Sequence, residues 1–316
     1  MGLSRKQRGR PLNAILLLDK PLGITSNRAL QQVKGIYQAR KAGHTGSLDP
    51  LATGMLPICF GEATKLSAFL LDADKQYRGR CKLGITTTTA DGEGTIVQQR
   101  PVEEYSEATL NAVIARFCGK IMQIPPMYSA LKKDGVPLYK LAREGKEVVR
   151  EPRQVTIYHL ALQRLSADEL EIVVSCSKGT YIRTLVEDIG EALGCGAHLS
   201  ALQREQVGPF AMSQMVTMAA LSSAAEDGFA ALDALLLPMQ EALQGWPAVT
   251  VTTTGLFYLQ QGQAVQIPRA PDAGWVRIFT QAGEFMGVGA ILEDGRVAPK
   301  RLFVQHAASG GLDKTG

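Results

Sequence analysis

The residues best suited to chemistry lie between positions 43 and 54, in the segment GHTGSLDPLATG. Three glycines and a proline in twelve residues predict a loop with special backbone angles. This loop contains Asp49, and a carboxylate can act as a covalent nucleophile when a neighbouring cation keeps it ionised. A lone aspartate in such a loop is more often a turn former that binds its own backbone. Composition alone favours the turn former and leaves a catalytic Asp49 open.

Other kinds of catalytic or cofactor site find little support in the sequence. The four histidines are scattered, and Cys195 and His198 have ligand-like spacing without a second pair nearby. The chain contains no GxxxxGK[ST] phosphate loop, no GxGxxG after a strand and no GxSxG around a serine. We therefore expect no metal and no cofactor.

Composition sets broad limits on the class of protein. The 316 residues are 45% hydrophobic and 20% charged, which predicts a folded chain of about two domains. The net charge is only +4, but residues 1–50 hold nine basic and two acidic residues, a distribution suited to a phosphate-binding face. No apolar run approaches the roughly 18 residues of a membrane span. The five cysteines are spread out without a CxxC, so we expect a reduced, cytoplasmic protein.

The elements flanking the loop can be predicted from hydrophobic periodicity. A short buried strand is expected over residues 12–18, followed by a helix that Ser26 caps and that runs through Tyr37. Strict alternation over residues 77–85 predicts a strand that turns Tyr77 inward and a basic row outward.

Changes of composition divide the chain into segments. Residues 125–153 hold seven basic and four acidic residues and predict an insertion that stands off the core. Short β-type runs separated by glycine turns follow Trp246-Pro247 and suggest a small barrel or sandwich. The predicted division is a flexible basic arm over 1–11, a catalytic domain over 12–245 with its insertion at 125–153, a C-terminal β domain over 246–305 and a frayed tail over 306–316.

Several ordered motifs then make the sequence recognisable. They are DKPLGITS at 19–26, the loop at 43–54, KQY at 75–77 leading to LG at 83–84, MYSALK at 127–132, SKGTYIR at 177–183 and GRVAPKR at 295–301. In this order they closely resemble the TruB family of tRNA pseudouridine synthases over roughly residues 12–305. The chain departs from many relatives at Thr86–Thr89, where an acidic residue is common, and at Gln203, where a second arginine often stands.

The resemblance implies an α+β fold. It consists of a mixed, mainly antiparallel sheet flanked by helices, followed by a small C-terminal β-barrel of the PUA type. The implied partner is the T arm of tRNA, gripped by the insertion at 125–153, and no membrane or metal is implied. Nothing in the sequence demands more than a monomer.

The resemblance also implies roles for residues around Asp49. It makes Asp49 the catalytic nucleophile and Arg183 its ionic partner. Arg183 stands in the first turn of a predicted helix, where a cation opposes the helix dipole, which suggests a specific anionic partner. It further implies that His44 helps to open the RNA and fills the space that the target base leaves.

Three more residues are implied to line the uracil pocket. Tyr77 should stack on the base and help to remove its C5 proton, Tyr181 should pack near the uracil, and Leu202 should close the pocket. A plain core position is the alternative for an inward-facing tyrosine. The motif match favours substrate contact for Tyr77.

The implied function is isomerisation of the T-loop uridine, position 55 of tRNA, to pseudouridine. A non-catalytic tRNA-folding or RNA-binding module that uses the same surface is the main alternative. A nucleoside hydrolase is a third possibility, but glycoside hydrolysis typically uses two carboxylates, and the loop offers only Asp49.

Overall fold

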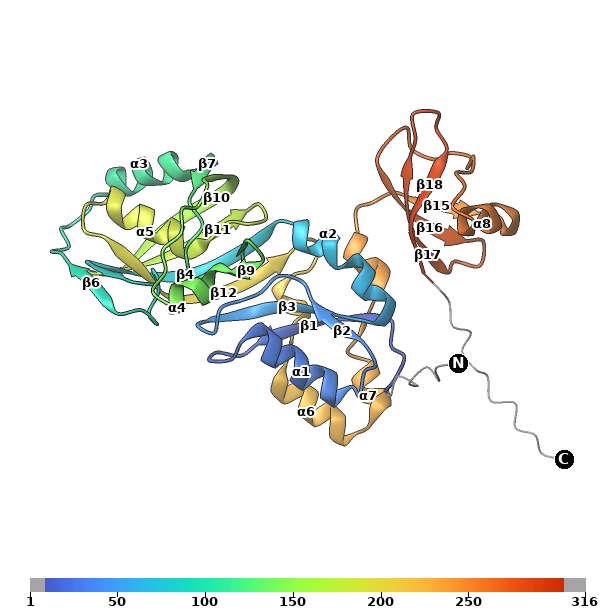
Figure 1. Ribbon diagram of the computed structural model, residues 1–316, viewed down its shortest axis with the longest axis horizontal. Helices are drawn as coiled ribbons and strands as arrows, with labels where there is room; N and C mark the ends of the chain where they lie inside the picture. Colours follow the sequence, from blue (N-terminus) through green and yellow to red (C-terminus); the bar gives the residue numbers. More distant parts are fainter. Residues whose placement is uncertain (1–8, 304–316) are drawn as a thin grey trace.

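The computed structural model describes residues 9–303 of the chain. A large sheet with helices on both faces makes up most of an elongated molecule, and a separate small sheet lies at the C-terminal end (Figure 1). Of the expected arm, residues 1–8 lie outside the described residues, as does the whole of the expected tail at 306–316. Arg10 is held in place, because it forms an ion pair with Asp233 and its guanidinium lies 4.1 Å from the centre of the Phe229 ring.

The large sheet is mixed and mainly antiparallel, which confirms the expected fold class. Its main path runs β13-β1-β3-β12-β4-β11-β10-β7, with β14 on β1 and β2 on β3. The parallel pairs are β1 with β13 and β12 with β3. The strands are β1 Ala14–Lys20, β2 Ala42–His44, β3 Ala52–Phe60, β4 Lys75–Leu83, β7 Gly119–Gln123, β10 Arg153–Ser166, β11 Glu169–Cys176, β12 Ala197–Val207, β13 Val216–Thr217 and β14 Leu237–Pro238.

Apolar faces of the helices cover this sheet in separate clusters. One cluster places α1, α6 and α7 against β1 and β3, and a second places α3 and α5 against β4, β10, β11 and β12. The α-helices are α1 Ser26–Ile36, α2 Ser67–Asp72, α3 Glu107–Phe117, α4 Leu138–Arg143, α5 Ile182–Ala192, α6 Met218–Glu226, α7 Phe229–Asp233 and α8 Thr253–Gln260. Three 3-10 helices span Gly61–Leu66, Met212–Gln214 and Met239–Leu243.

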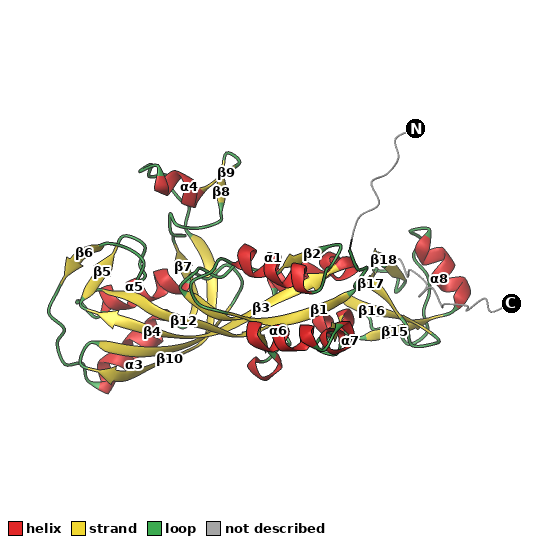
Figure 2. Cartoon of the chain, turned by 90° about the horizontal axis from the view of Figure 1, so that it is seen from below, coloured by secondary structure: helices red, strands yellow, loops and turns green. Residues whose placement is uncertain are grey.

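The segment at 125–153 stands off the large sheet, and Figure 2 shows it as a projection formed by β8, β9 and α4. Its hairpin pairs β8 (Lys132–Lys133) with β9 (Val136–Pro137), and α4 follows directly. A second small hairpin, β5 (Ile85–Thr87) with β6 (Ile96–Gln99), lies at the end of the molecule opposite the small C-terminal sheet (Figure 1).

The C-terminal region differs from the expected closed barrel. Its four strands form an open sheet in the order β15-β16-β17-β18 within the described residues. The helix α8 packs against both edge strands, β15 and β18. Leu259 of α8 is buried among valines of these strands, so a helix rather than a further strand covers this side of the sheet. The strands are β15 Ala248–Val251, β16 Trp275–Thr280, β17 Phe285–Ile291 and β18 Val297–Leu302.

The small sheet and the large sheet share one hydrophobic core. Phe285 and Phe303 are buried in the same cluster as Leu17 of β1 and Met55 of β3. Because burial of a large aromatic side chain stabilises a fold by several kcal/mol, this shared cluster should couple the two sheets thermodynamically.

Phe285→Ala is therefore expected to destabilise the whole chain by about 3–5 kcal/mol, because it opens a cavity in the shared core. Thermal unfolding followed by circular dichroism should show one transition that moves as a unit. Phe257→Ala is the matched control: this side chain is 57% exposed, so the change should cost less than about 1 kcal/mol. Two separate transitions, of which only one responds to Phe285→Ala, would contradict the coupling.

Candidate active site

The loop that contains Asp49 is tied down at several backbone positions. The Ser26 hydroxyl accepts a hydrogen bond from the Leu48 N–H at 2.7 Å and donates one to the Leu48 carbonyl at 3.0 Å. The Gly23 N–H donates to the Pro50 carbonyl at 2.9 Å. The expectation that Ser26 caps the helix was wrong: Thr25 is the N-cap of α1, which leaves the Ser26 side chain free to brace the loop.

Asp49 forms an ion pair with Arg183, the cation that the family resemblance implied for it. Arg183, in the first turn of α5, places its Nε atom 3.0 Å from Asp49 Oδ2. The Arg183 side chain is only 6% exposed, whereas 48% of the Asp49 side chain is exposed. The carboxylate is therefore accessible from outside while its partner forms part of the interior.

Arg183 is held by groups from two further segments. Its Nη1 donates to the Thr89 carbonyl at 3.0 Å and lies 3.4 Å from Asp91 Oδ2, and its Nη2 donates to the Tyr128 carbonyl at 2.7 Å. Asp91 is 2% exposed and also accepts hydrogen bonds from the Thr89 hydroxyl and from a backbone N–H. A buried cation with this many partners is fixed in position and cannot turn away from Asp49.

Opposing influences act on the ionisation of Asp49. Burial raises the pKa of its carboxyl above the ordinary value, Arg183 and Lys20 act to lower it, and Asp91 adds to the increase. The net direction is upward. The direct contact with Arg183 and the half-exposed side chain both favour the ionised form, so we expect a carboxylate at neutral pH.

Tyr77 and Leu202 lie side by side on one face of the large sheet. Tyr77 pairs with Arg204 across β4 and β12, and Leu202 pairs with Gly79, so alternate positions of both strands project to the same side. Tyr77 is 9% exposed and inward-facing, as the alternation predicted. Burial raises the pKa of Tyr77, and nearby Asp49 adds to this increase, which brings the phenol and the carboxylate into one electrostatic environment.

Tyr181 is positioned through its backbone. The Gln123 side-chain amide accepts from the Tyr181 N–H at 3.0 Å and donates to the Tyr181 carbonyl at 3.2 Å. Gln123 ends β7, so the start of the insertion is tied to the start of α5. Burial raises the pKa of Tyr181, Arg183 opposes the increase and Asp49 contributes to it, which brings Tyr181 into the same environment as the ion pair.

His44 approaches the site from another direction, at the end of β2. Burial lowers the pKa of its imidazole and the Arg204 charge adds to this effect, so the ring is neutral near pH 7. Its Nδ1 atom is buried without a hydrogen-bond partner in the described structure. A buried nitrogen without a partner is uncommon in a folded protein and costs stability.

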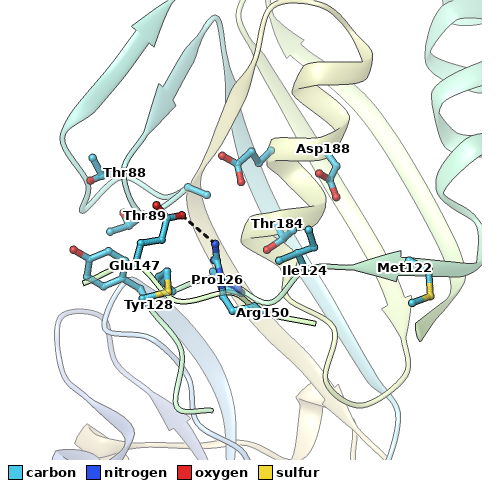
Figure 3. Close-up of a pocket in the computed structure, with 13 residues that line it drawn as sticks. Thr88, Thr89, Met122, Ile124, Pro126, Tyr128, Glu147, Arg150, Thr184 and Asp188 are labelled. Atoms are coloured by element: carbon cyan, nitrogen blue, oxygen red, sulfur yellow. Dashed lines mark ion pairs between the residues drawn. The ribbon is translucent and has the colours of Figure 1, made fainter. Parts of the chain in front are cut away.

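A pocket of about 480 Å³ lies between α5, residues 88–90 and the insertion (Figure 3). Thr89 and Tyr128, whose carbonyls bind Arg183, line it, and so do Glu147 and Arg150 of the insertion, which form an ion pair at 3.5 Å. Neither Asp49 nor Arg183 is among its lining residues, so this pocket is not the space beside the Asp49 carboxylate.

The structure thus places Asp49 against Arg183, Tyr181 two residues before Arg183 at the start of α5, and Leu202 beside Tyr77 on one sheet face. No contact joins His44 to these residues among the described interactions. Sequence reasoning missed the supporting residues. They are Gln123, Asp91 and Arg204, each 2% exposed. A buried polar side chain is a signal for such a role, but burial becomes visible only in three dimensions.

Two further findings concern metals and membranes. Within residues 9–303, no group of three or more His, Cys, Asp or Glu side chains is arranged to hold a metal ion. Over the same range, no helix combines the length and the apolar character needed to cross a membrane.

Comparison with known families and proteins agrees with this geometry. Residues 34–182 match the model of the N-terminal domain of TruB family pseudouridylate synthases. Residues 183–244 match the tRNA pseudouridylate synthase B C-terminal domain, and 247–303 match the C-terminal region of pseudouridine synthase II TruB. The tRNA pseudouridine synthase B of Nitrosococcus oceani is 55% identical over 97% of this chain and 100% of its own. That of Pseudomonas fluorescens Pf0-1 is 56% identical over 93% and 96%. The chain belongs to the TruB family of pseudouridylate synthases.

Solved structures show the same fold. A Cbf5-Nop10-Gar1 complex contains a chain that is 26% identical, with a TM-score of 0.72 over 92% of this chain and 85% of that chain. An H/ACA RNP bound to a substrate RNA containing 2′-deoxyuridine contains a chain with a TM-score of 0.71, covering 96% of this chain and 92% of that chain. At 23% identity, this second similarity concerns the fold alone.

The ion pair gives a prediction about Asp49. Arg183→Gln should raise the pKa of the Asp49 carboxyl further, because Arg183 is the strongest influence that lowers it. A higher pKa means that the carboxylate takes up its proton at a higher pH. The midpoint can be followed by carbon NMR of labelled aspartate, with Asp49→Asn assigning the signal. Arg78→Gln is the control, because Arg78 is paired with Glu171 and Glu205 instead. An unchanged or lower midpoint in Arg183→Gln would contradict the prediction.

Proposed function

We propose that this protein isomerises the T-loop uridine at position 55 of tRNA to pseudouridine, by base flipping and covalent catalysis through Asp49. The observation that carries the proposal is the half-exposed Asp49 carboxylate 3.0 Å from the buried Arg183 guanidinium. Relatives about 55% identical over nearly the whole chain are named tRNA pseudouridine synthase B, which supports both the reaction and the substrate.

Flipping of the target base accounts for the groups around Asp49. An enzyme that works on a base inside folded RNA must draw it into a pocket, usually against aromatic side chains. In this proposal Tyr77 stacks on the uracil, and Tyr181 and Leu202 complete the walls of the pocket. His44, with its neutral ring, takes the place of the flipped base in the RNA.

The reaction itself requires one bond to be exchanged for another. The Asp49 carboxylate adds to the nucleoside, the N1–C1′ bond breaks, the uracil turns and a C5–C1′ bond forms. The C5 proton leaves, N1 takes up a proton, and the bond to Asp49 breaks to release the carboxylate. Covalent addition divides this exchange into easier steps. Arg183 keeps the carboxylate ionised and oriented throughout. Substrate and product are isomers, so the exchange has no net oxidation or reduction.

Recognition of the T arm would use a wide basic surface. We assign catalysis to residues 12–245, gripping of the T arm to the insertion at 125–153 and further RNA binding to 246–305. The insertion carries seven basic residues on a projection beside the Asp49–Arg183 pair, since the carbonyl of Tyr128 binds Arg183. The cytoplasmic location, the monomeric state and the absence of a cofactor stay predictions.

Asp49→Asn tests the proposal directly. An unmodified tRNA transcript labelled with tritium at C5 of uridine should release tritium with the natural chain, and primer extension after carbodiimide treatment should stop at the T-loop uridine alone. Asp49→Asn should bind tRNA but lower the single-turnover rate at least about a thousandfold, because an amide cannot act as the nucleophile.

Tight tRNA binding without tritium release by the natural chain would overturn the enzymatic proposal and favour the non-catalytic RNA-folding module. Free uracil as the product would instead indicate a nucleoside hydrolase. Full activity of Asp49→Asn would retain the enzyme but remove Asp49 from its mechanism.

The insertion gives a separate prediction. Lys132→Ala and Lys133→Ala, both in exposed β8, should each weaken tRNA binding and reduce the slope of log K against log salt by up to about 1. The single-turnover rate at saturating enzyme should stay the same. Lys82→Ala is a matched control, because Lys82 lies on the sheet face opposite Tyr77 and is paired with Asp168. Equal salt slopes in all four proteins would count against a gripping role.

A further inference from the structure

Arg204 of β12 is a buried cation in an unusual environment. It is among the largest fully buried side chains, at 2% exposure, and among the described residues no carboxylate forms an ion pair with it. Its hydrogen bonds go to backbone carbonyls instead: Nε donates to Met55 at 2.7 Å and Nη2 to Gly46 at 3.1 Å. A charge buried in this way is costly unless its position serves a purpose.

The two carbonyls that Arg204 binds enclose the loop that contains Asp49. Gly46 lies three residues before Asp49, and Met55 lies just inside the strand that follows the loop. Gly54 makes this approach possible: it has a φ of +93°, and a Cβ atom there would lie 2.4 Å from the Arg204 carbonyl oxygen. The end of the loop at Gly54 therefore packs directly against the Arg204 backbone, and the Arg204 side chain binds carbonyls on both sides of Asp49.

Arg204 also reaches the tyrosine of the pocket. It is the direct cross-strand partner of Tyr77, so both side chains project from the same face of the sheet. Its charge lowers the pKa of Tyr77 against the larger increase that burial causes. The same charge adds to the lowering of the His44 pKa.

We propose that Arg204 is a positioning residue for the isomerisation, in which one guanidinium fixes the Asp49 loop and the Tyr77 hydroxyl in register with each other. It touches no substrate and acts through these two groups. The inference rests on the proposed function and extends it to a residue outside the pocket.

Arginine suits this task for a geometric reason. Its planar guanidinium donates in several fixed directions at once, so it binds the Met55 and Gly46 carbonyls together while it lies beside Tyr77 on the sheet. Lysine supplies the same charge from a single point and cannot reproduce this fixed geometry. The conservative change Arg204→Lys therefore separates the geometry of the contact from its charge.

The experiment measures single-turnover tritium release and tRNA binding for Arg204→Lys and Arg204→Met in the full-length chain. We expect the rate to fall at least about tenfold in Arg204→Lys and about a hundredfold in Arg204→Met, with tRNA affinity within about threefold of the natural chain. Arg80→Lys and Arg80→Met are matched controls on the exposed face of β4 and should change neither quantity.

A double-mutant cycle shows whether Arg204 acts through the tyrosine. Arg204→Met should cost less in a Tyr77→Phe background than in the natural chain, because the hydroxyl that it orients is then absent. A residue that only stabilises the fold would give additive effects. Circular dichroism and thermal unfolding of each variant confirm that it is folded.

Several outcomes would overturn the inference. One is a single-turnover rate in Arg204→Lys equal to that of the natural chain, and another is an equal loss of rate and tRNA affinity. A third is additivity of Arg204→Met with Tyr77→Phe. Failure of both Arg204 variants to fold would show a role in stability alone. Failure of the proposed function looks different, because the natural chain itself would then release no tritium.

Discussion

The site depends on keeping the Asp49 carboxylate ionised although it is partly buried. Burial favours the neutral form of Asp49, and the nearby Arg183 cation opposes this while the carboxylate stays accessible. The buried guanidinium must itself be compensated. The buried Asp91 and two backbone carbonyls provide that compensation, so the charge of the half-exposed Asp49 carboxylate is balanced by a network that lies inside the protein.

This requirement explains why the site draws on segments far apart in the chain. Asp49 precedes β3, Asp91 lies between β5 and β6, the Tyr128 carbonyl comes from the insertion, and Arg183 begins α5. The large sheet brings them together, because β12 is paired with β3 on one side and with β4 on the other. The insertion thus contributes to the ion-pair network through Tyr128 even though most of it stands off the sheet (Figure 2).

Much of this was accessible from the sequence, and the exceptions share a cause. Alternation, a local pattern, predicted the inward face of Tyr77. Local composition favoured a turn former at Asp49, and the ion pair with Arg183 was expected only from the family resemblance. Ser26 was misassigned as a cap, because its hydroxyl binds Leu48, a contact that only the folded chain creates. The small C-terminal barrel is an open sheet for a similar reason: short strands with glycine turns do not reveal that α8 packs against β15 and β18.

The two buried arginines show how charge and geometry are divided within the site. Arg183 meets carboxylates, so its effect is mainly on ionisation, and its pairing with Asp91 limits the net charge that it leaves behind. Arg204 hydrogen-bonds with backbone carbonyls, so no carboxylate neutralises its positive charge among the described residues. This charge acts to lower the pKa of Lys20, His44 and Tyr77. The pKa of Lys20 falls to about 8, mainly through burial, while Asp49 acts to raise it. An excess of positive charge beneath the pocket matches a polyanionic substrate, whose phosphates would supply the missing negative charge on binding.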